Sequence, residues 1–309
     1  MGFANNSEII KKVQDLLPSI GTGSGASSLI TGYHHIHQDL EQLIANLLNC
    51  EQAILFPSGY MANLAIADVL LNLDNSNTIA IHDHNNHASI LDGTKLAHCK
   101  LARYAHNNTE HLEKILTKYN YVNNKFIFTE SLFSMDGDFA DLENINNLFI
   151  NHNLTPDNSV LIIDESHAFG LYNKNGQGLI NNNKLIKNTL IMGTFGKAIG
   201  SAGAFVAGPK LFIEALVQFA RPYIYTTHLS PIAAAASLYA IKLNYQNPSY
   251  REKLFDNINY FCNQLLSIGI LPINHHSPIQ PIIIGDNFVT VQAAQYLQKN
   301  NIIATAIRS

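Results

Sequence analysis

The sequence predicts an α/β protein with a mostly parallel central sheet and helices on both of its faces. Short apolar runs recur along the chain, and stretches with the apolar spacing of amphipathic helices separate them. Strand, crossover helix and strand in this order are typical of parallel strands buried on both faces. The 309 residues, 47% of them apolar, suffice for about two domains with a large buried core.

The expected elements follow in chain order. A helix is expected over residues 7–17, before a glycine-rich loop at 21–33. The apolar runs predict strands at 53–56, 78–83, 125–130, 159–165 and 190–195. Helical spacing predicts helices at 60–73, 87–97, 231–243 and 250–268. An apolar run at 279–286, a helix and a second run at 301–308 predict the start of a smaller α/β unit.

Composition narrows the classes of function. The net charge is −4 and no run of Lys or Arg occurs, so neither nucleic acid nor a membrane surface is an expected partner. No apolar stretch is long enough to span a membrane, and no secretory signal is recognisable. Cys50, Cys99 and Cys262 are far apart, which argues against a disulfide framework or a zinc site and fits a reducing cytoplasm. A small molecule is the expected partner.

Open sheets of this class bind ligands beyond the carboxyl ends of their strands. After the strand at 53–56, Ser58 and Gly59 open a helix, so the free N–H groups of Gly59 and Tyr60 predict an anion site. Hydroxyl donors for a dianionic phosphate would come from Ser58, Thr194, Thr226 and Thr227. The alternative for Ser58 is a plain helix cap.

Polar residues also follow the other strands. Asp164 ends an apolar strand with His167 three residues on, and a buried carboxylate there needs a cation or several donors. Capping of the following turn is the alternative for Asp164. Two more segments supply His87 at a helix start, and Glu130 with Ser134 after a strand.

Lys197 follows the strand at 190–195 and has three explanations. A phosphate-binding P-loop does not fit, because Gly193 is too close and Ala198 replaces the required Ser or Thr. A surface lysine on a turn is the ordinary alternative, yet the neighbours are apolar or small. The third explanation is a lysine partly desolvated in a cleft, whose amine can form an imine with a carbonyl.

One ligand accounts for all these groups, namely an aromatic aldehyde with a phosphate and a basic ring nitrogen. Pyridoxal 5'-phosphate matches that description. Lys197 would hold the aldehyde as a Schiff base, Asp164 would keep the ring nitrogen protonated, and the Gly59 and Tyr60 amides would bind the phosphate. No metal is expected, because the histidines of "YHHIHQ" lack metal-ligand spacing; His37 is expected to pack at the start of the next helix.

The sequence resembles the α-oxoamine synthases, a family of fold-type I pyridoxal phosphate enzymes. The resemblance runs nearly end to end, in "GTGSGASSLITGYHHIHQDLEQLIANLL", "AILFPSGYMAN", "NHASILDG", "TESLFSMDGDFADL", "IDESHAFGLYNKNGQG", "GTFGKAIGSAGAFV" and "QFARPYIYTTHLSP". It implies that Lys197 forms the Schiff base and moves the substrate's α-proton. His87 would stack on the cofactor ring and approach the amino acid carboxylate, and Asp164 would pair with the ring nitrogen.

The remaining site residues are also implied by the resemblance. Ser134 and His167 would reach the ring hydroxyl, and Ser58, Gly59, Tyr60 and Thr194 would surround the phosphate. Thr227 would reach the phosphate of the neighbouring subunit's cofactor, which implies a homodimer with the glycine-rich loop near its active site.

The implied reaction is a decarboxylating condensation of L-alanine with a pimeloyl thioester, carried on coenzyme A or acyl carrier protein, in biotin biosynthesis. The alternatives are a sibling reaction on glycine or serine, or a cofactor-binding but inactive fragment. The expected units are an N-terminal arm at 1–18, a large cofactor-binding domain at 19–240 and the start of a small domain at 241–309. Two carboxylate-binding arginines of the family are expected outside the chain, so both terminal units are expected to be incomplete.

Overall fold

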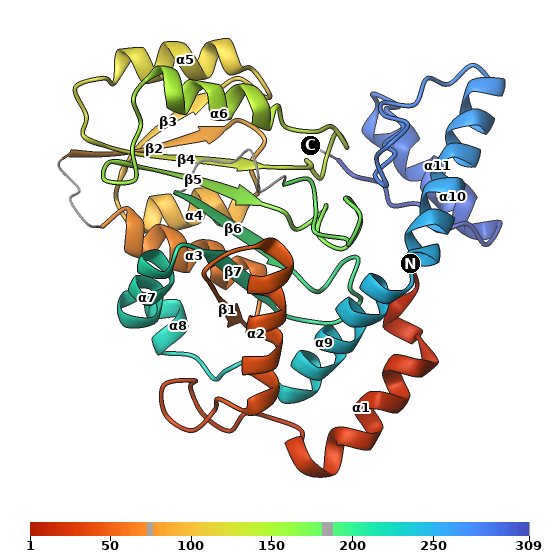
Figure 1. Ribbon diagram of the computed structural model, residues 1–309. Coiled ribbons are helices and arrows are strands. Elements are labelled where there is room, and N and C mark those ends of the chain that lie inside the picture. Colours follow the sequence, from red (N-terminus) through yellow and green to blue (C-terminus); the bar gives the residue numbers. More distant parts are fainter. Residues whose placement is uncertain (73–76, 181–187, 309) are drawn as a thin grey trace.

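The centre of the protein is a mixed sheet with the strand order β1-β7-β6-β5-β4-β2-β3 (Figure 1). The computed structural model describes residues 1–72, 77–180 and 188–308. Within these ranges the strands are β1 (Gln52–Phe56), β2 (Thr78–Asp83), β3 (Lys100–Tyr104), β4 (Asn124–Glu130), β5 (Ser159–Asp164), β6 (Thr189–Thr194) and β7 (Ala204–Gly208). Strands β3, β2, β4, β5 and β6 are mutually parallel, whereas β7 is antiparallel to both β1 and β6.

Helices cover both faces of this sheet (Figure 1). Before and between the strands lie α1 (Ser7–Ile20), α2 (His35–Leu48), α3 (Gly59–Leu70), α4 (Ala88–Leu96), α5 (Thr109–Lys118) and α6 (Leu142–Asn151). After the last strand come α7 (Lys210–Phe219), α8 (Arg221–Ile224), α9 (Pro231–Gln246), α10 (Ser249–Ser267) and α11 (Asn287–Lys299), and a 3-10 turn η1 (Phe3–Asn5) precedes α1. The expected α/β architecture is therefore confirmed.

The core lies on both sides of the sheet because side chains alternate along each strand. Ile54 and Phe56 of β1 join one apolar cluster with α3 and α7, while Leu55 between them joins a second cluster with α2 and α9. All three side chains are buried. Each Å² of apolar surface that these two layers remove from water stabilises the fold by about 25 cal/mol, so they are the main source of stability.

All five strands predicted between residues 53 and 195 are present, and β3 and β7 were not predicted. β3 contains Lys100 and Arg103 and lies at the sheet edge, so it lacks the apolar run of a buried strand. β7 lies inside the glycine-spaced stretch after Lys197, where small residues hide its pattern. The predicted helices also form, with boundaries shifted by a few residues.

The C-terminal region differs from the expected α/β unit. Helices α10 and α11 lie to one side of the sheet (Figure 1). Residues 279–286 and 301–308 form no strand, although they have the apolar residues that a strand would need. A strand requires a hydrogen-bonded neighbour, and these two segments do not pair with each other. The proposed division at residues 18 and 240 remains a prediction.

The glycine-rich segment 21–33 forms a loop, as predicted, and packs on the segment before α9. Ser24 Oγ donates to the Leu229 carbonyl at 2.6 Å, and the His228 amide donates to the Ala26 carbonyl at 3.0 Å. His37 is buried at the start of α2, where its Nε2 lies 2.8 Å from the Leu229 oxygen. None of the helices in the described ranges has the length and apolar content needed to cross a membrane.

Candidate active site

A cavity of about 190 Å³ opens at the carboxyl ends of β4, β5 and β6. The N-termini of α3 and α4 form its other walls. Its lining consists of Gly59, Tyr60, Asn63, His87, Ser89, Glu130, Asp164, Ser166, His167, Met192, Thr194 and Lys197. Seven of the ten residues predicted for the site therefore line one cavity, as expected where parallel strands end at a common edge.

Lys197 lies on the turn that follows β6, and its amine enters this cavity. Its Nζ lies 2.6 Å from Nε2 of His167. Partial burial lowers the pKa of Lys197, against the opposing effect of Asp164 and Glu130. Burial, and then the charge of Lys197, lower the pKa of His167 to about 4, so this ring is neutral at pH 7 and accepts the hydrogen bond. The lysine is less shielded than predicted, because the cavity mouth leaves it accessible to solvent.

Asp164 ends β5 and is only 4% exposed. Its Oδ1 accepts a hydrogen bond from the Ser166 amide at 2.8 Å, and its Oδ2 accepts one from Asn63 Nδ2 at 3.1 Å. Both interpretations of this residue are therefore compatible: the carboxylate caps the turn after β5 and also lines the cavity. Two donors reduce the cost of burying its charge.

Glu130 ends β4 directly beside Asp164 in the sheet register. Its Oε1 accepts a hydrogen bond from the His87 amide at 2.6 Å. Burial, followed by repulsion from Asp164, raises the pKa of Glu130 to about 8. The cavity therefore contains two carboxyl groups side by side, of which one is held largely protonated at neutral pH.

His87 is the N-cap residue of α4, and its ring lines the cavity. The Nδ1 atom lies 2.7 Å from Ser89 Oγ and accepts a hydrogen bond from the Ser89 amide at 3.2 Å. With the Glu130 contact to its backbone, His87 is held at both the main chain and the ring. Such restraint is what an active-site side chain needs to keep a fixed orientation.

The N-terminus of α3 forms the opposite wall. Gly59 and Tyr60 line the cavity together with Thr194, and a Cβ atom on Gly59 would lie 3.6 Å from Thr194 Cγ2. Ser58 does not line the cavity, because its Oγ caps α3 by accepting from the Met61 amide at 3.3 Å. The plain-cap alternative thus describes the contact that Ser58 makes in this structure.

Two other predicted residues lie outside the cavity lining. Ser134 is half-buried in the loop after β4, and Thr227 is exposed in the loop before α9. Conversely, the prediction omitted Asn63, Ser89, Glu130, Ser166 and Met192, which do line it. Glu130 was recognised as a strand-end carboxylate but was not assigned to the site.

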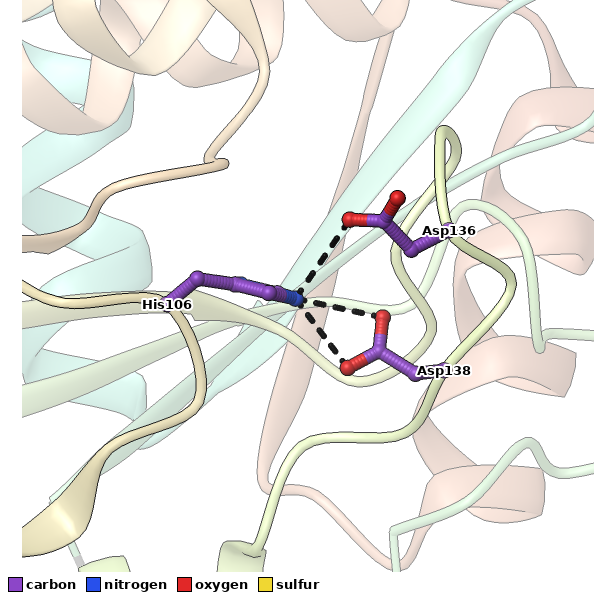
Figure 2. Close-up of side chains that lie close together, drawn as sticks. All are labelled: His106, Asp136 and Asp138. Carbon is purple, nitrogen blue, oxygen red and sulfur yellow. Dashed lines mark hydrogen bonds and ion pairs between the residues drawn. The ribbon is translucent and has the colours of Figure 1, made fainter. Parts of the chain in front are cut away.

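A second polar cluster lies at the same edge of the sheet and joins His106 to three aspartates. Nδ1 of His106 lies 2.8 Å from Asp83 Oδ1, and Nε2 lies 3.1 Å from Asp138 Oδ2 and 3.7 Å from Asp136 Oδ2 (Figure 2). These carboxylates outweigh the effect of burial and raise the pKa of His106. The three residues of Figure 2 have the spacing of a metal site. Both ring nitrogens face carboxylates at hydrogen-bond distance, so the ring links the end of β2 to the segment between β4 and α6.

Comparisons with known proteins agree with this geometry. The family model described as aminotransferase class I and II matches residues 3–309. The 8-amino-7-oxononanoate synthases of Hahella chejuensis and Hydrogenovibrio crunogenus are 37% and 38% identical to the chain, over all of it and 76% of each relative.

Solved structures give the same result. A serine palmitoyltransferase from S. paucimobilis with a bound PLP–myriocin aldimine matches with a TM-score of 0.91 at 27% identity, covering 98% of this chain and 78% of that one. The 8-amino-7-oxononanoate synthase of Francisella tularensis matches with a TM-score of 0.83 at 31% identity, covering 99% and 85%. The chain belongs to the aminotransferase class I and II family and, within it, to the fold-type I α-oxoamine synthases.

Proposed function

We propose that this α-oxoamine synthase condenses L-alanine with a pimeloyl thioester, with loss of carbon dioxide, to give 8-amino-7-oxononanoate for biotin biosynthesis. The observation that carries the proposal is the 37–38% identity to synthases of that name along the whole chain. Their names support the choice of alanine and a pimeloyl group on coenzyme A or acyl carrier protein. The three free cysteines support a cytoplasmic location.

The cofactor of this enzyme is pyridoxal phosphate, as in the serine palmitoyltransferase structures. The cavity residues fit it. Asp164 and Glu130 place two carboxyl groups against one amine, and burial, followed by repulsion from Asp164, raises the pKa of Glu130. A protonated ring nitrogen would supply the missing cation. The N-terminus of α3, open to the cavity at Gly59 and Tyr60, suits a phosphate.

We assign the cofactor contacts on this basis. Asp164 would hold the ring nitrogen, and Lys197 would hold the aldehyde carbon. The amides of Gly59 and Tyr60 would bind the phosphate together with the Thr194 hydroxyl. When bound, pyridoxal phosphate supplies an aldehyde that condenses with amines and a ring that stabilises negative charge at the substrate α-carbon.

The chain's own groups then manage the protons. Lys197 must be an uncharged amine to attack a carbonyl, and its lowered pKa increases that fraction at neutral pH. His167 stays neutral and accepts from Nζ, so it orients the amine without keeping its proton. The same Nζ would remove the proton from the α-carbon of the amino acid. His87, held over the cavity, would bind the substrate carboxylate until it leaves as carbon dioxide.

Hydride reduction tests the assignment of Lys197. The holoenzyme is treated with borohydride, digested and analysed by mass spectrometry, and the cofactor adduct is expected on the peptide containing Lys197. Lys197→Ala should abolish the adduct, whereas Lys210→Ala, a change of an exposed lysine that pairs with Glu214, should leave it unchanged. An adduct on another lysine would refute the assignment.

Substrate choice needs a separate assay. Purified enzyme is given alanine, glycine or serine with pimeloyl-CoA, acetyl-CoA or palmitoyl-CoA, and the products are identified by mass spectrometry. Serine is the second candidate, because the serine palmitoyltransferase has a higher TM-score than the Francisella synthase although its identity is lower. Turnover of glycine or serine, with none of alanine, would overturn the proposed substrate.

We also propose a homodimer in which Thr227 reaches the cofactor phosphate of the partner subunit. Thr227 is exposed, and the adjoining loops expose the large apolar side chains of Leu29, Ile30, Tyr33 and Tyr225. A surface of this kind is typical of an interaction site.

Sedimentation should give twice the mass of the chain. Thr227→Ala should weaken cofactor binding by roughly 10–100-fold without dissociating the dimer, as expected for the loss of one hydrogen bond to a charged group.

A further inference from the structure

A chain of buried polar side chains connects Asp164 to His87 behind the cavity. Asn63 on α3 and Ser89 on α4 are its middle members, and they are 2% and 1% exposed. Asn63 Nδ2 lies 3.1 Å from Asp164 Oδ2 and 2.9 Å from Ser89 Oγ. Ser89 Oγ lies in turn 2.7 Å from His87 Nδ1. We refer to Asn63 and Ser89 as the relay.

The direction of the first two hydrogen bonds follows from charge. A carboxylate can only accept, so Asn63 must turn its NH₂ group, not its oxygen, toward Asp164. One N–H then serves Asp164 and the other serves Ser89. The Oδ1 atom of Asn63 is buried and has no hydrogen-bond partner among the described residues. An unsatisfied buried acceptor is costly, which indicates that the amide is held in place for its two donors.

The direction of the last hydrogen bond follows from the first two. Because Ser89 Oγ accepts from Asn63, its own hydrogen is available for His87 Nδ1. The Ser89 backbone N–H also points at Nδ1, at 3.2 Å, and a backbone N–H can only donate. Nδ1 therefore carries a lone pair, and in the neutral ring the proton is on Nε2.

We propose that Asn63 and Ser89 are positioning residues that fix His87 as the Nε2–H tautomer. The Asp164 carboxylate, which can only accept, sets the direction of their hydrogen bonds. Glu130 holds the His87 backbone, so the relay only has to set the ring. The ring then has a hydrogen-bond donor on the side opposite Ser89. Its use as a donor to the amino acid carboxylate rests on the proposed function, whereas the tautomer itself does not.

Nitrogen NMR measures the tautomer directly. The holoenzyme is prepared with ring-¹⁵N histidine, and the His87 signals are those lost in His87→Gln. An unprotonated ring nitrogen resonates well downfield of a protonated one, and in the wild type Nδ1 is expected to be the downfield nitrogen. Ser89→Ala removes one donor and should give a mixture of tautomers. Asn63→Asp offers Ser89 an acceptor, so the hydroxyl turns away from His87 and the Nδ1–H form should increase.

Two variants serve as controls. Ser89→Thr keeps the hydroxyl and should retain the wild-type tautomer. Ser237→Ala also removes a buried helical hydroxyl, which bonds to the Ala233 carbonyl within α9, and should change nothing at His87. A protonated Nδ1 in the wild type would overturn the proposal. Unchanged His87 signals in both Ser89→Ala and Asn63→Asp would also overturn it.

Kinetics add a readout on the amino acid. Loss of a well-oriented donor should raise KM for the amino acid in Ser89→Ala by roughly 5–10-fold, with a smaller change in kcat. Ser89→Thr and Ser237→Ala should remain within about 2-fold of the wild type. An equal loss in Ser89→Ala and Ser237→Ala would mean that the hydroxyl serves packing alone, which overturns the positioning role. Failure of the enzyme on alanine would refute the proposed function while the NMR result stands separately.

Discussion

Replacement of Glu130 by Gln should change the pH dependence of stability in a predictable direction. Glu130 is 2% exposed, and burial together with the neighbouring Asp164 raises its pKa from 4.5 to about 8. At a pH between these two pKa values, Glu130 keeps its proton in the folded protein but releases it in the unfolded chain. A raised pKa therefore contributes stability that is complete below pH 4.5 and is lost as the pH rises through 8. Glutamine keeps the oxygen that accepts from the His87 amide but cannot ionise.

The expected size follows from the two pKa values. Over the full range the proton on Glu130 is worth roughly 5 kcal/mol. Burial lowers the pKa of His37, His82, His167 and His228, so these histidines affect stability at acidic pH. In the unfolded chain they lose their charge as the pH rises through 6.5, and this change is the same in the wild type and in Glu130→Gln. Between pH 6.5 and 8 the wild type should lose about 1.5 kcal/mol more than Glu130→Gln.

Urea unfolding of the cofactor-free protein measures this difference, because only the chain's own groups then titrate. Glu214→Gln changes an exposed glutamate on α7 and should leave the wild-type pH dependence intact. Glu165→Gln should likewise make the free energy of unfolding depend less on pH, since burial also raises the pKa of Glu165 to about 8. If Glu130→Gln and the wild type lose equal stability from pH 6.5 to 8, Glu130 is not the protonated group and the reasoning fails.

Three further changes test the described contacts. His106→Gln should cost about 2–3 kcal/mol at pH 6 and clearly less at pH 9, because the raised pKa of His106 stabilises the fold only while the ring is charged; urea unfolding at both pH values gives the comparison. Gly178→Ala should lower the free energy of unfolding in urea by about 3 kcal/mol or abolish soluble expression, since φ is +103° and the new Cβ would collide with the Glu165 carboxyl group. Ser58→Ala should cost about 1 kcal/mol by removing the cap of α3, and an unchanged urea midpoint would contradict that cap.

The fold could be predicted because its buried parallel strands leave a strong pattern. β2, β4, β5 and β6 are apolar runs between helical periods, and each was predicted within about one residue of its bounds. β3 and β7 were missed for opposite reasons. β3 is an edge strand whose polar residues face solvent, and β7 is a short buried strand in which two alanines and a glycine flank Phe205 and Val206. Neither sequence shows the pattern of a half-buried strand.

In the C-terminal segments, by contrast, strands are predicted from the sequence but are absent from the structure. The apolar residues of 279–286 and 301–308 predict strands, yet both segments form no strand and are largely exposed. Ile283 is 80% exposed and Ile303 is 95% exposed. An apolar pattern records that a side chain suits a buried strand, but the strand forms only when a neighbour pairs with its backbone. Within the described residues that neighbour is absent.

The site was predictable where function requires a charged group on a strand end. Asp164 is the last residue of β5, and Lys197 and His87 come shortly after β6 and β2, so the topology of the sheet alone brings them to one edge. The roles of Ser134 and Thr227 were assigned by the family resemblance. Ser134 would contact the cofactor, and Thr227 would contact the cofactor of the partner subunit, so neither contact can be seen in a single chain. The contacts of those two residues therefore remain proposals.

The residues that were missed share a sequence signal of their own. Asn63 lies within "GYMANLAIADVL", where the other buried side chains of α3 are all apolar, and one polar residue among them has to find a partner inside the protein. Its position, four residues after Gly59, puts it one helical turn below the helix end that faces the cavity. Ser89 is likewise a buried polar residue in the first turn of α4. In this sheet, a lone polar residue on the buried face of a helix, within about one turn of the strand ends, marks a group that contacts the side chains lining the cavity.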